Sequence, residues 1–239
     1  MTRTSQISEV LIEKLTPLTA GNRLELLQQE FEGRLVASTS FGIQSAVMLD
    51  LIARHAPEIP VVFVDTGFLF PETYRYGEEL VSRFGTDLRV YQPVMSAARL
   101  EALHGRLWEQ GSDGSELYGR ITKVEPMARA LNELGADLWI SGVRRSQSKT
   151  RSDRSILELQ KRTLKAYPIL DWADAQVSAY MHERRLPRHP LADQGYVTMG
   201  DWHSTSPAVD GLDPEATRFG GAKYECGLHL ESGDNDFQI

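Results

Sequence analysis

The residues from Leu35 to Ser45 read LVASTSFGIQS and bring three structural signals together. Leu35 to Ala37 is an apolar run typical of a buried strand, small hydroxyl residues follow it, and helical spacing extends from Ile43 to His55. A strand that leads through such a turn into a helix directs backbone N–H groups and the positive end of the helix dipole toward one point, where anions bind. We therefore expect an anion-binding loop here. A serine-rich helix cap without a ligand is the alternative.

Several positions in this loop are candidates for phosphate contacts. The hydroxyls of Ser38, Ser40 and Ser45 can donate hydrogen bonds, and Gly42 lets the backbone approach a ligand closely. Gln44 adds a neutral amide directly before Ser45.

The same order of strand, turn and helix recurs along the chain, which implies a parallel sheet. We expect an α/β fold, with an open, mainly parallel twisted sheet flanked by helices and preceded by two amphipathic helices between Ile7 and Phe31. Such sheets bind ligands at the carboxyl ends of their strands, so the loops at Ser38, Asp65 and Ser141 are expected to face one crevice. Further strands are predicted at 61–64, 88–90 and 138–140, and helices at 71–84, 97–110 and 123–134.

The composition is that of one folded globular domain. The chain has 239 residues, of which 41% are hydrophobic, enough for one substantial core. We expect a single domain over 1–239, with a helical cap over 1–33 and a C-terminal region from about residue 195. That region is rich in Gly, Pro, Asp and Ser, and its last residues are expected to form a mobile tail.

Charge and cysteine content argue against several classes of protein. The net charge of −7 disfavours a nucleic-acid binder, and the sequence shows no signal peptide or membrane-length apolar run. The single cysteine rules out an internal disulfide and a multi-cysteine metal or iron–sulfur site. We therefore expect a cytoplasmic protein without a nucleic-acid or membrane partner.

A basic segment follows the strand predicted at 138–140. It places five cations within the eleven residues from Arg144 to Arg154, in a chain that is negative overall. Charge runs are usually solvated surface, but this one directly follows a strand, where polyanions dock on parallel sheets. Arginine is also the side chain suited to bidentate phosphate binding. A phosphate-binding segment is the favoured interpretation.

Cys226 lies in the run Glu225-Cys226-Gly227-Leu228-His229, close to the C-terminus. A lone cysteine is more often a small buried apolar residue, but this one has polar and glycine neighbours. Lys223 and His229 each lie three positions away and would favour the nucleophilic thiolate, whereas Glu225 would oppose it.

The run from Glu225 to His229 resembles the signature of the sulfonucleotide reductases, and the Leu35–Ser45 loop resembles their pyrophosphate loop. These enzymes belong to the adenine nucleotide alpha hydrolase-like superfamily, and the likeness covers about residues 20 to 230. ATP-cleaving members carry an aspartate where this chain has Gln44, which favours the phosphoadenylyl-sulfate reductase branch. The resemblance implies Cys226 and His229 as catalytic residues. It also implies further substrate contacts by Asp65, Gly67, Lys123, Arg144, Arg145, Gln147, Arg151, Arg218 and Lys223.

Reductases of plain adenylyl sulfate typically hold an iron–sulfur cluster on two cysteine pairs. Here Tyr118-Gly119 takes the place of the first pair, and Asp201 and Ser204 that of the second. The sequence thus resembles the cluster-free type, with no bound cofactor and with 3′-phosphoadenylyl sulfate as substrate.

In the mechanism that the resemblance implies, Cys226 takes the sulfonate as a cysteine thiosulfonate and adenosine 3′,5′-bisphosphate leaves. Because no second cysteine exists, thioredoxin or glutaredoxin would release sulfite, as in assimilatory sulfate reduction. The family likeness also suggests a homodimer. The alternatives are a cluster-free adenylyl-sulfate reductase, an ATP-cleaving adenylyl transferase and a non-catalytic nucleotide sensor; the intact tail disfavours the last two.

Overall fold

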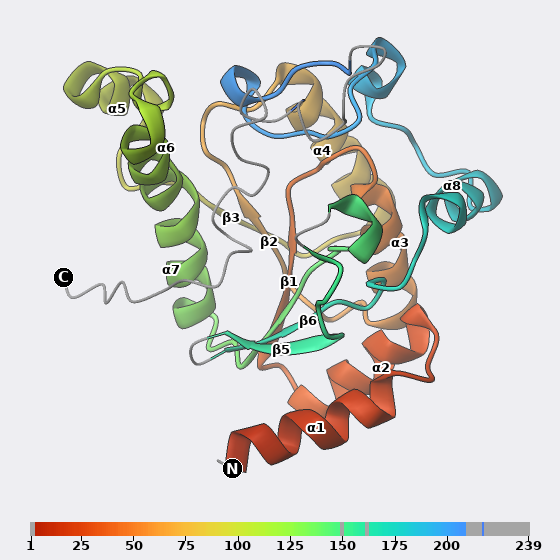
Figure 1. The fold of residues 1–239 in the computed structure, drawn as a ribbon. Helices are drawn as coiled ribbons and strands as arrows, with labels where there is room; N and C mark the ends of the chain where they lie inside the picture. The colour runs from red at the N-terminus through yellow and green to blue at the C-terminus, as the bar shows by residue number, and fades with distance from the viewer. Residues whose placement is uncertain (1–2, 149–150, 161–162, 209–216, 218–239) are drawn as a thin grey trace.

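A computed structural model describes residues 3–148, 151–160, 163–208 and 217, and a six-stranded sheet forms its centre (Figure 1). The strand order is β3-β2-β1-β4-β6-β5. All neighbours pair in parallel except β5 and β6, which form an antiparallel hairpin at one edge. The expected α/β class with a mainly parallel sheet is confirmed. The strands are β1 Leu35–Thr39, β2 Val61–Val64, β3 Leu88–Tyr91, β4 Leu138–Ile140, β5 Leu157–Gln160 and β6 Thr163–Ala166.

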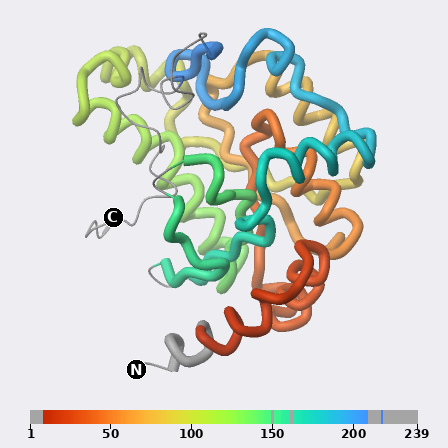
Figure 2. The backbone as a smooth tube through the Cα atoms, turned by 45° about the vertical axis from the view of Figure 1, so that its right-hand side comes forward, coloured from red at the N-terminus to blue at the C-terminus, as the bar shows by residue number. Residues whose placement is uncertain are grey.

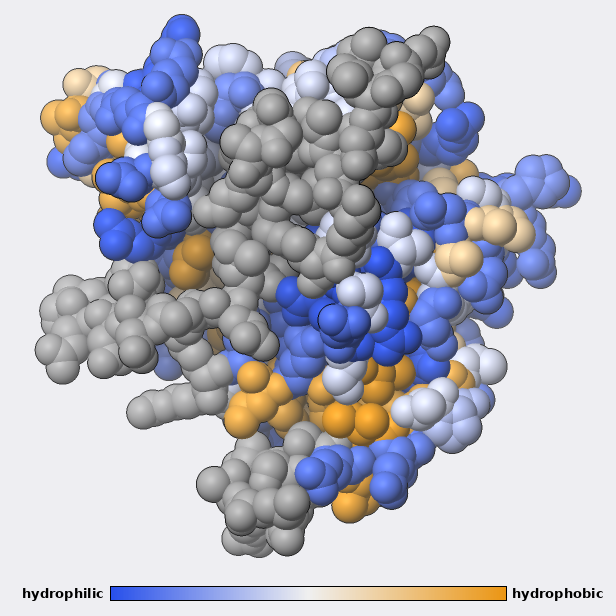
Figure 3. Space-filling view, in the orientation of Figure 1, coloured by the Kyte–Doolittle hydropathy of each residue, from blue (hydrophilic) through white to orange (hydrophobic). Residues whose placement is uncertain are grey.

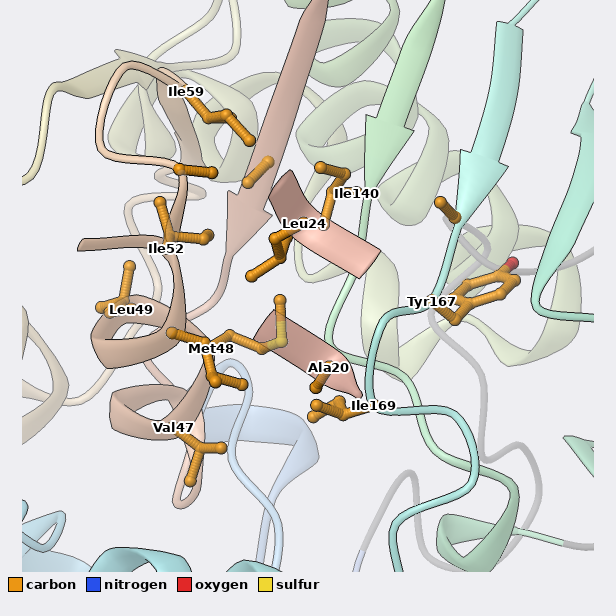
Figure 4. Close-up of a cluster of buried hydrophobic side chains, with 14 of the residues drawn as sticks. Ala20, Leu24, Val47, Met48, Leu49, Ile52, Ile59, Ile140, Tyr167 and Ile169 are labelled. Carbon is orange, nitrogen blue, oxygen red and sulfur yellow. The ribbon is translucent and has the colours of Figure 1, made fainter. Parts of the chain in front are cut away.

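Helices cover both faces of the sheet. Successive strand residues point to opposite faces, so Leu35 and Ala37 pack with the larger apolar core, while Val36 joins a smaller cluster with α7 (Glu125–Glu133). Figure 4 shows part of the larger core, where Met48 and Ile52 of α3 (Ser45–His55) lie among residues of several elements. The other long helices are α1 Arg3–Leu15, α2 Ala20–Phe31, α4 Pro71–Phe84, α5 Ala97–His104, α6 Gly111–Gly119 and α8 Asp174–Glu183.

The N-terminal helices and the last described loop lie at opposite ends of the molecule (Figure 2). Helix α2 is tied to the segment after β6 by Arg23, whose buried guanidinium pairs with Asp171 at 2.7 Å and donates to the carbonyl of Pro168. The pairing lowers the pKa of Asp171. Since α1 and α2 lie away from the carboxyl ends of the strands, that end is left open for the site.

Two of the predicted helices differ from those observed. The pattern predicts one helix over 97–110, but α5 ends at His104 because Gly105 adopts a positive φ of 69°, and a 3-10 turn, η1, covers Leu107–Glu109. The helix predicted to begin at Lys123 instead continues α6. One π-helical turn, η2 (Arg120–Val124), joins α6 to α7.

The sequence pattern does not predict the hairpin of β5 and β6 or helix α8. Both strands have only four residues, so the alternation of apolar and polar residues in LELQ and TLKA is too short to give a clear strand signal. Three further 3-10 turns are η3 Arg145–Gln147, η5 Pro190–Gln194 and η6 Trp202–Ser204. Among the described residues no helix is both long and apolar enough to span a membrane.

Candidate functional site

A pocket of about 300 Å³ opens at the carboxyl ends of β1, β2 and β4. It lies where parallel α/β sheets bind ligands. Figure 3 shows hydrophilic residues gathered near the middle of the visible face, where Figure 1 draws the segment after β4. The predicted site residues that line the pocket are Ser38, Ser40, Gly42, Gln44, Ser45, Lys123, Arg144, Gln147 and Arg151.

The loop between β1 and α3 is anchored by Phe41. This residue has a positive φ of 48°, a conformation that costs energy for a bulky side chain, yet its ring is buried against Phe63 with centroids 4.8 Å apart. The ring also packs on α4, where a Cβ added at Gly77 would meet it at 2.9 Å. The buried ring thus fixes the loop backbone on either side of it, between Ser40 and Gly42.

The serines of this loop have different partners. Ser38 accepts a hydrogen bond from the Trp139 indole at 2.7 Å, which orients its hydroxyl at the end of β1. The Ser45 hydroxyl donates to the carbonyl of Gly42 at 2.7 Å and closes the first turn of α3. The pocket therefore has a polar wall formed at the start of a helix, as the sequence predicts.

The basic segment forms a second wall. Arg144 is 2% exposed, and its guanidinium donates to the side-chain oxygens of Gln44 and Ser146. It also pairs with Asp174 at 2.8 Å, although that carboxylate is 71% exposed. The Gln147 side-chain oxygen accepts from the Arg144 backbone N–H and from the Arg151 guanidinium. Fixed guanidinium groups of this kind suit phosphate or sulfate ligands.

The floor of the pocket holds an ion pair. Lys123 Nζ lies 2.6 Å from Asp201 Oδ2, and the side chains are only 8% and 0% exposed. The Thr66 hydroxyl donates to Asp201 Oδ1 at 2.5 Å. Burial alone would raise the pKa of Asp201. The Lys123 charge and the hydrogen bonds from Lys123 and Thr66 together have the larger, opposite effect, so the pKa falls below the ordinary value. The carboxylate is therefore ionised at neutral pH.

Three predicted site residues do not line the pocket. Asp65 accepts hydrogen bonds from the Gly67 backbone at 2.9 Å and the Tyr74 hydroxyl at 2.6 Å, so its carboxylate stabilises the turn after β2. Gly67 itself has a positive φ of 77° in that turn. The second loop instead contributes Thr66 to the crevice. Arg145 turns away and donates to the carbonyl of Arg154.

The four predicted site residues nearest the C-terminus, Arg218, Lys223, Cys226 and His229, lie outside the described residues. The expected mobile tail falls in the same part of the chain. Within the described ranges no three His, Cys, Asp or Glu side chains are grouped so that they could hold a metal ion.

The sequence pattern gives no indication of Thr66, Asp201 or Trp139 as site residues. Thr66 and Asp201 are 135 positions apart, and an isolated bridge between Leu69 and Asp201 brings them together. The sequence pattern predicts Trp139 as a core residue of a strand. Its contact with the loop is seen only in the structure, where its indole nitrogen donates to Ser38. For Asp201 the sequence offers two weak signals: it is an acid in a stretch that contains Gly and Ser, and it takes the place of a cluster cysteine of related reductases.

The mainly parallel sheet flanked by helices is that of the adenine nucleotide alpha hydrolase-like fold. The chain shares this fold with an FMN adenylyltransferase from Candida glabrata, at a TM-score of 0.58 and 15% identity over 86% of this chain and 71% of that one. At this identity the likeness concerns the fold alone.

The chain belongs to the phosphoadenosine phosphosulfate reductase domain family, whose model matches residues 34–207. It is 50% identical to the phosphoadenosine 5′-phosphosulfate reductase of Alkalilimnicola ehrlichii over 90% of this chain and 88% of that protein. The enzyme of the same name from Photobacterium profundum is 45% identical, over 97% and 91%. A phosphoadenylyl-sulfate reductase structure from Candida auris, a phosphate complex, matches with a TM-score of 0.74 and 31% identity over 86% and 99%. The chain is therefore an enzyme of this reductase type, with a general function in sulfate reduction.

Proposed function

We propose that the protein reduces 3′-phosphoadenylyl sulfate to sulfite and adenosine 3′,5′-bisphosphate. The observation that carries this proposal is the strand-end pocket, in which the Leu35–Ser45 loop, Arg144, Arg151 and Lys123 converge in a chain that is negative overall. Local positive charge of this kind suits a ligand with several anionic groups. Relatives at 45–50% identity carry the name of this activity.

The two walls of the pocket would divide the binding of the substrate. The loop between β1 and α3 offers backbone N–H groups and hydroxyls at a helix start, which suits phosphate. Arg144 and Arg151 offer guanidinium groups for further anionic oxygens. Lys123 on the floor would face the phosphosulfate, as the family resemblance implies. Arg218 and Lys223 would add cations around the sulfate.

In the first chemical step the thiolate of Cys226 attacks the sulfur atom of the phosphosulfate. The new bond joins Cys226 Sγ to sulfur, the bond from sulfur to the bridging oxygen breaks, and adenosine 3′,5′-bisphosphate leaves with that electron pair. Lys123, Arg144 and Arg151 would stabilise the charge on the leaving group. His229, three residues from Cys226, would favour the thiolate as a nearby cation.

The second step needs an external dithiol because Cys226 is the only cysteine in the chain. A thiolate of reduced thioredoxin or glutaredoxin attacks Cys226 Sγ and sulfite leaves with the bonding pair. The second thiol of the partner then resolves the mixed disulfide, which frees Cys226 and leaves the partner oxidised. We further propose a cluster-free homodimer that works in the cytoplasm, with residues 1–239 as one catalytic domain.

ATP-cleaving transfer on the same fold is the second candidate, since the Candida glabrata adenylyltransferase shares the sheet. The pocket supports it less well. Gln44 occupies the loop position where an acid would help to bind magnesium, and Asp201, the acid among the described lining residues, is already paired with Lys123.

Sulfite release from each sulfonucleotide, with and without thioredoxin, tests the proposed function. We expect sulfite from 3′-phosphoadenylyl sulfate only when thioredoxin is present, and much slower release from adenylyl sulfate. Equal or faster turnover of adenylyl sulfate, or iron and labile sulfide in the purified protein, would contradict the proposal.

A further inference from the structure

Asp201 places a carboxylate in a pocket that otherwise gathers groups suited to binding anions. Its side chain is completely buried, yet the residue lines the pocket floor. A negative charge at this position weakens the attraction of the pocket for an anionic ligand. The carboxylate therefore needs an explanation other than direct ligand binding.

The contacts of Asp201 point to Lys123. Its Oδ2 lies 2.6 Å from Lys123 Nζ, while Thr66 donates to the other carboxylate oxygen at 2.5 Å. The backbone of Asp201 is fixed as well, because it bridges to Leu69 and its carbonyl accepts from the Ser204 N–H at 3.0 Å. A carboxylate held from both sides in this way offers a fixed acceptor to the lysine.

Lys123 needs such an anchor more than the arginines do. A lysine ammonium is a compact charge on a flexible four-carbon stem, whereas a guanidinium fork is preorganised by its planar shape. Lys123 sits on the π-helical turn η2, and its ammonium lies 5.7 Å from the centroid of the Tyr118 ring. π-helical turns inside α-helices frequently occur at functional sites. The turn fixes the backbone position of Lys123, and Asp201 fixes the position of its ammonium group.

We propose that Asp201 is a positioning residue for sulfonate transfer, which holds the Lys123 ammonium on the pocket floor where it meets the phosphosulfate. The inference rests on the proposed function, because it assumes that Lys123 acts on the reacting end of the substrate. It goes beyond that function by assigning a role to a carboxylate that itself touches no substrate. Thr66 supports the same arrangement through the hydrogen bond that it donates to Asp201.

Asp201→Asn removes the anchor with almost no change in shape. The asparagine oxygen can still accept from Thr66, but its NH₂ group cannot accept from the ammonium. We expect the rate of sulfonate transfer to Cys226, measured in a single turnover without thioredoxin, to fall at least tenfold. Binding of adenosine 3′,5′-bisphosphate, which has no sulfonate, should stay within about threefold of the parent.

A double-mutant cycle separates positioning from a merely structural role. Lys123→Met should slow transfer at least as much as Asp201→Asn, and the double variant should be no slower than Lys123→Met alone. The double variant leaves no unpaired buried charge, so it should fold. If the two losses multiply, or if Asp201→Asn transfers sulfonate at the parental rate, the proposal is overturned.

Thr66→Val provides a milder variant should Asp201→Asn fail to fold. It removes one hydrogen bond from the carboxylate and leaves Lys123 in place, so transfer should slow several-fold while product binding is unchanged. A parental transfer rate in this variant would equally overturn the proposal. Failure of the proposed function itself is distinguishable, because the parent protein would then transfer no sulfonate to Cys226.

Discussion

The arginine wall and the lysine floor of the pocket both present cations, but they are held in different ways. Arg144 is fixed largely by neutral oxygens of Gln44 and Ser146, and its carboxylate partner Asp174 is 71% exposed. Lys123 is fixed by Asp201, a carboxylate with no exposed surface. Water screens the first pair and leaves the Arg144 charge available, whereas the second pair is close to neutral as a unit.

Because of this difference, we expect the two regions to contribute to different steps, substrate binding and sulfonate transfer. The arginine wall supplies net positive charge, and charge at this position serves affinity for phosphates. The floor supplies a placed hydrogen-bond donor whose charge is already balanced, which adds little to affinity but can act on a developing charge. Loss of the wall should therefore weaken binding, while loss of the floor should slow the reaction.

Among variants of the arginine wall, Arg144→Ala is expected to have the largest effect on affinity. Loss of a charge-assisted contact costs about 1.5–3 kcal/mol, roughly ten- to hundredfold in affinity. The dissociation constant of adenosine 3′,5′-bisphosphate, measured by calorimetry, should rise by that factor. Asp174→Ala is the matched control, because it removes the exposed partner of the same guanidinium.

The control should change the dissociation constant by less than about threefold, because Asp174 is 71% exposed and water screens its charge. If Asp174→Ala weakens binding as much as Arg144→Ala, the wall depends on its ion pair as the floor does, and the distinction between the two regions fails.

A smaller effect is expected from Gly77→Ala, which tests how firmly the loop between β1 and α3 is held. The new methyl group would meet the Phe41 ring at 2.9 Å, and overpacking of this kind typically costs about 1–3 kcal/mol of folding free energy. Because the ring fixes the loop backbone, product affinity should also fall a few-fold. Chemical denaturation and calorimetry measure the two effects.

Phe41→Leu in the Gly77→Ala background provides the control for that variant. The smaller side chain should relieve the contact and restore part of the lost stability. A Gly77→Ala protein that is destabilised but binds the product with parental affinity would show that Phe41 supports the core alone and not the loop.

Local signals in the sequence predict the fold class and one wall of the pocket. The strand, turn and helix of the Leu35–Ser45 stretch are contiguous, so their pattern is readable without tertiary information, and β1, the loop and α3 confirm it. The helix predicted over 97–110 is wrong because Gly105 adopts a left-handed φ that periodicity does not register. The β5–β6 hairpin consists of two four-residue strands, LELQ and TLKA, whose alternation of apolar and polar residues is too short to stand out in the sequence.

The floor of the pocket could not be predicted in this way. Only the family resemblance predicts a role for Lys123, and its partner Asp201 reaches it because the chain returns to the second loop at the Leu69 bridge. A contact between residues that are far apart in the sequence produces no periodic pattern in either segment. For Asp65 the resemblance predicts a ligand contact, and in the structure its carboxylate accepts a hydrogen bond from the Gly67 N–H within the turn.

The most direct measurement is the mass of the peptide that contains Cys226 after the protein is mixed with 3′-phosphoadenylyl sulfate in the absence of thioredoxin. We expect this peptide to gain one sulfonate and to lose it when reduced thioredoxin is added, with sulfite released in equal amount. Cys226→Ser should bind adenosine 3′,5′-bisphosphate like the parent, gain no sulfonate and release no sulfite. Sulfite production by the serine variant, or turnover by the parent without any adduct, would contradict the covalent mechanism.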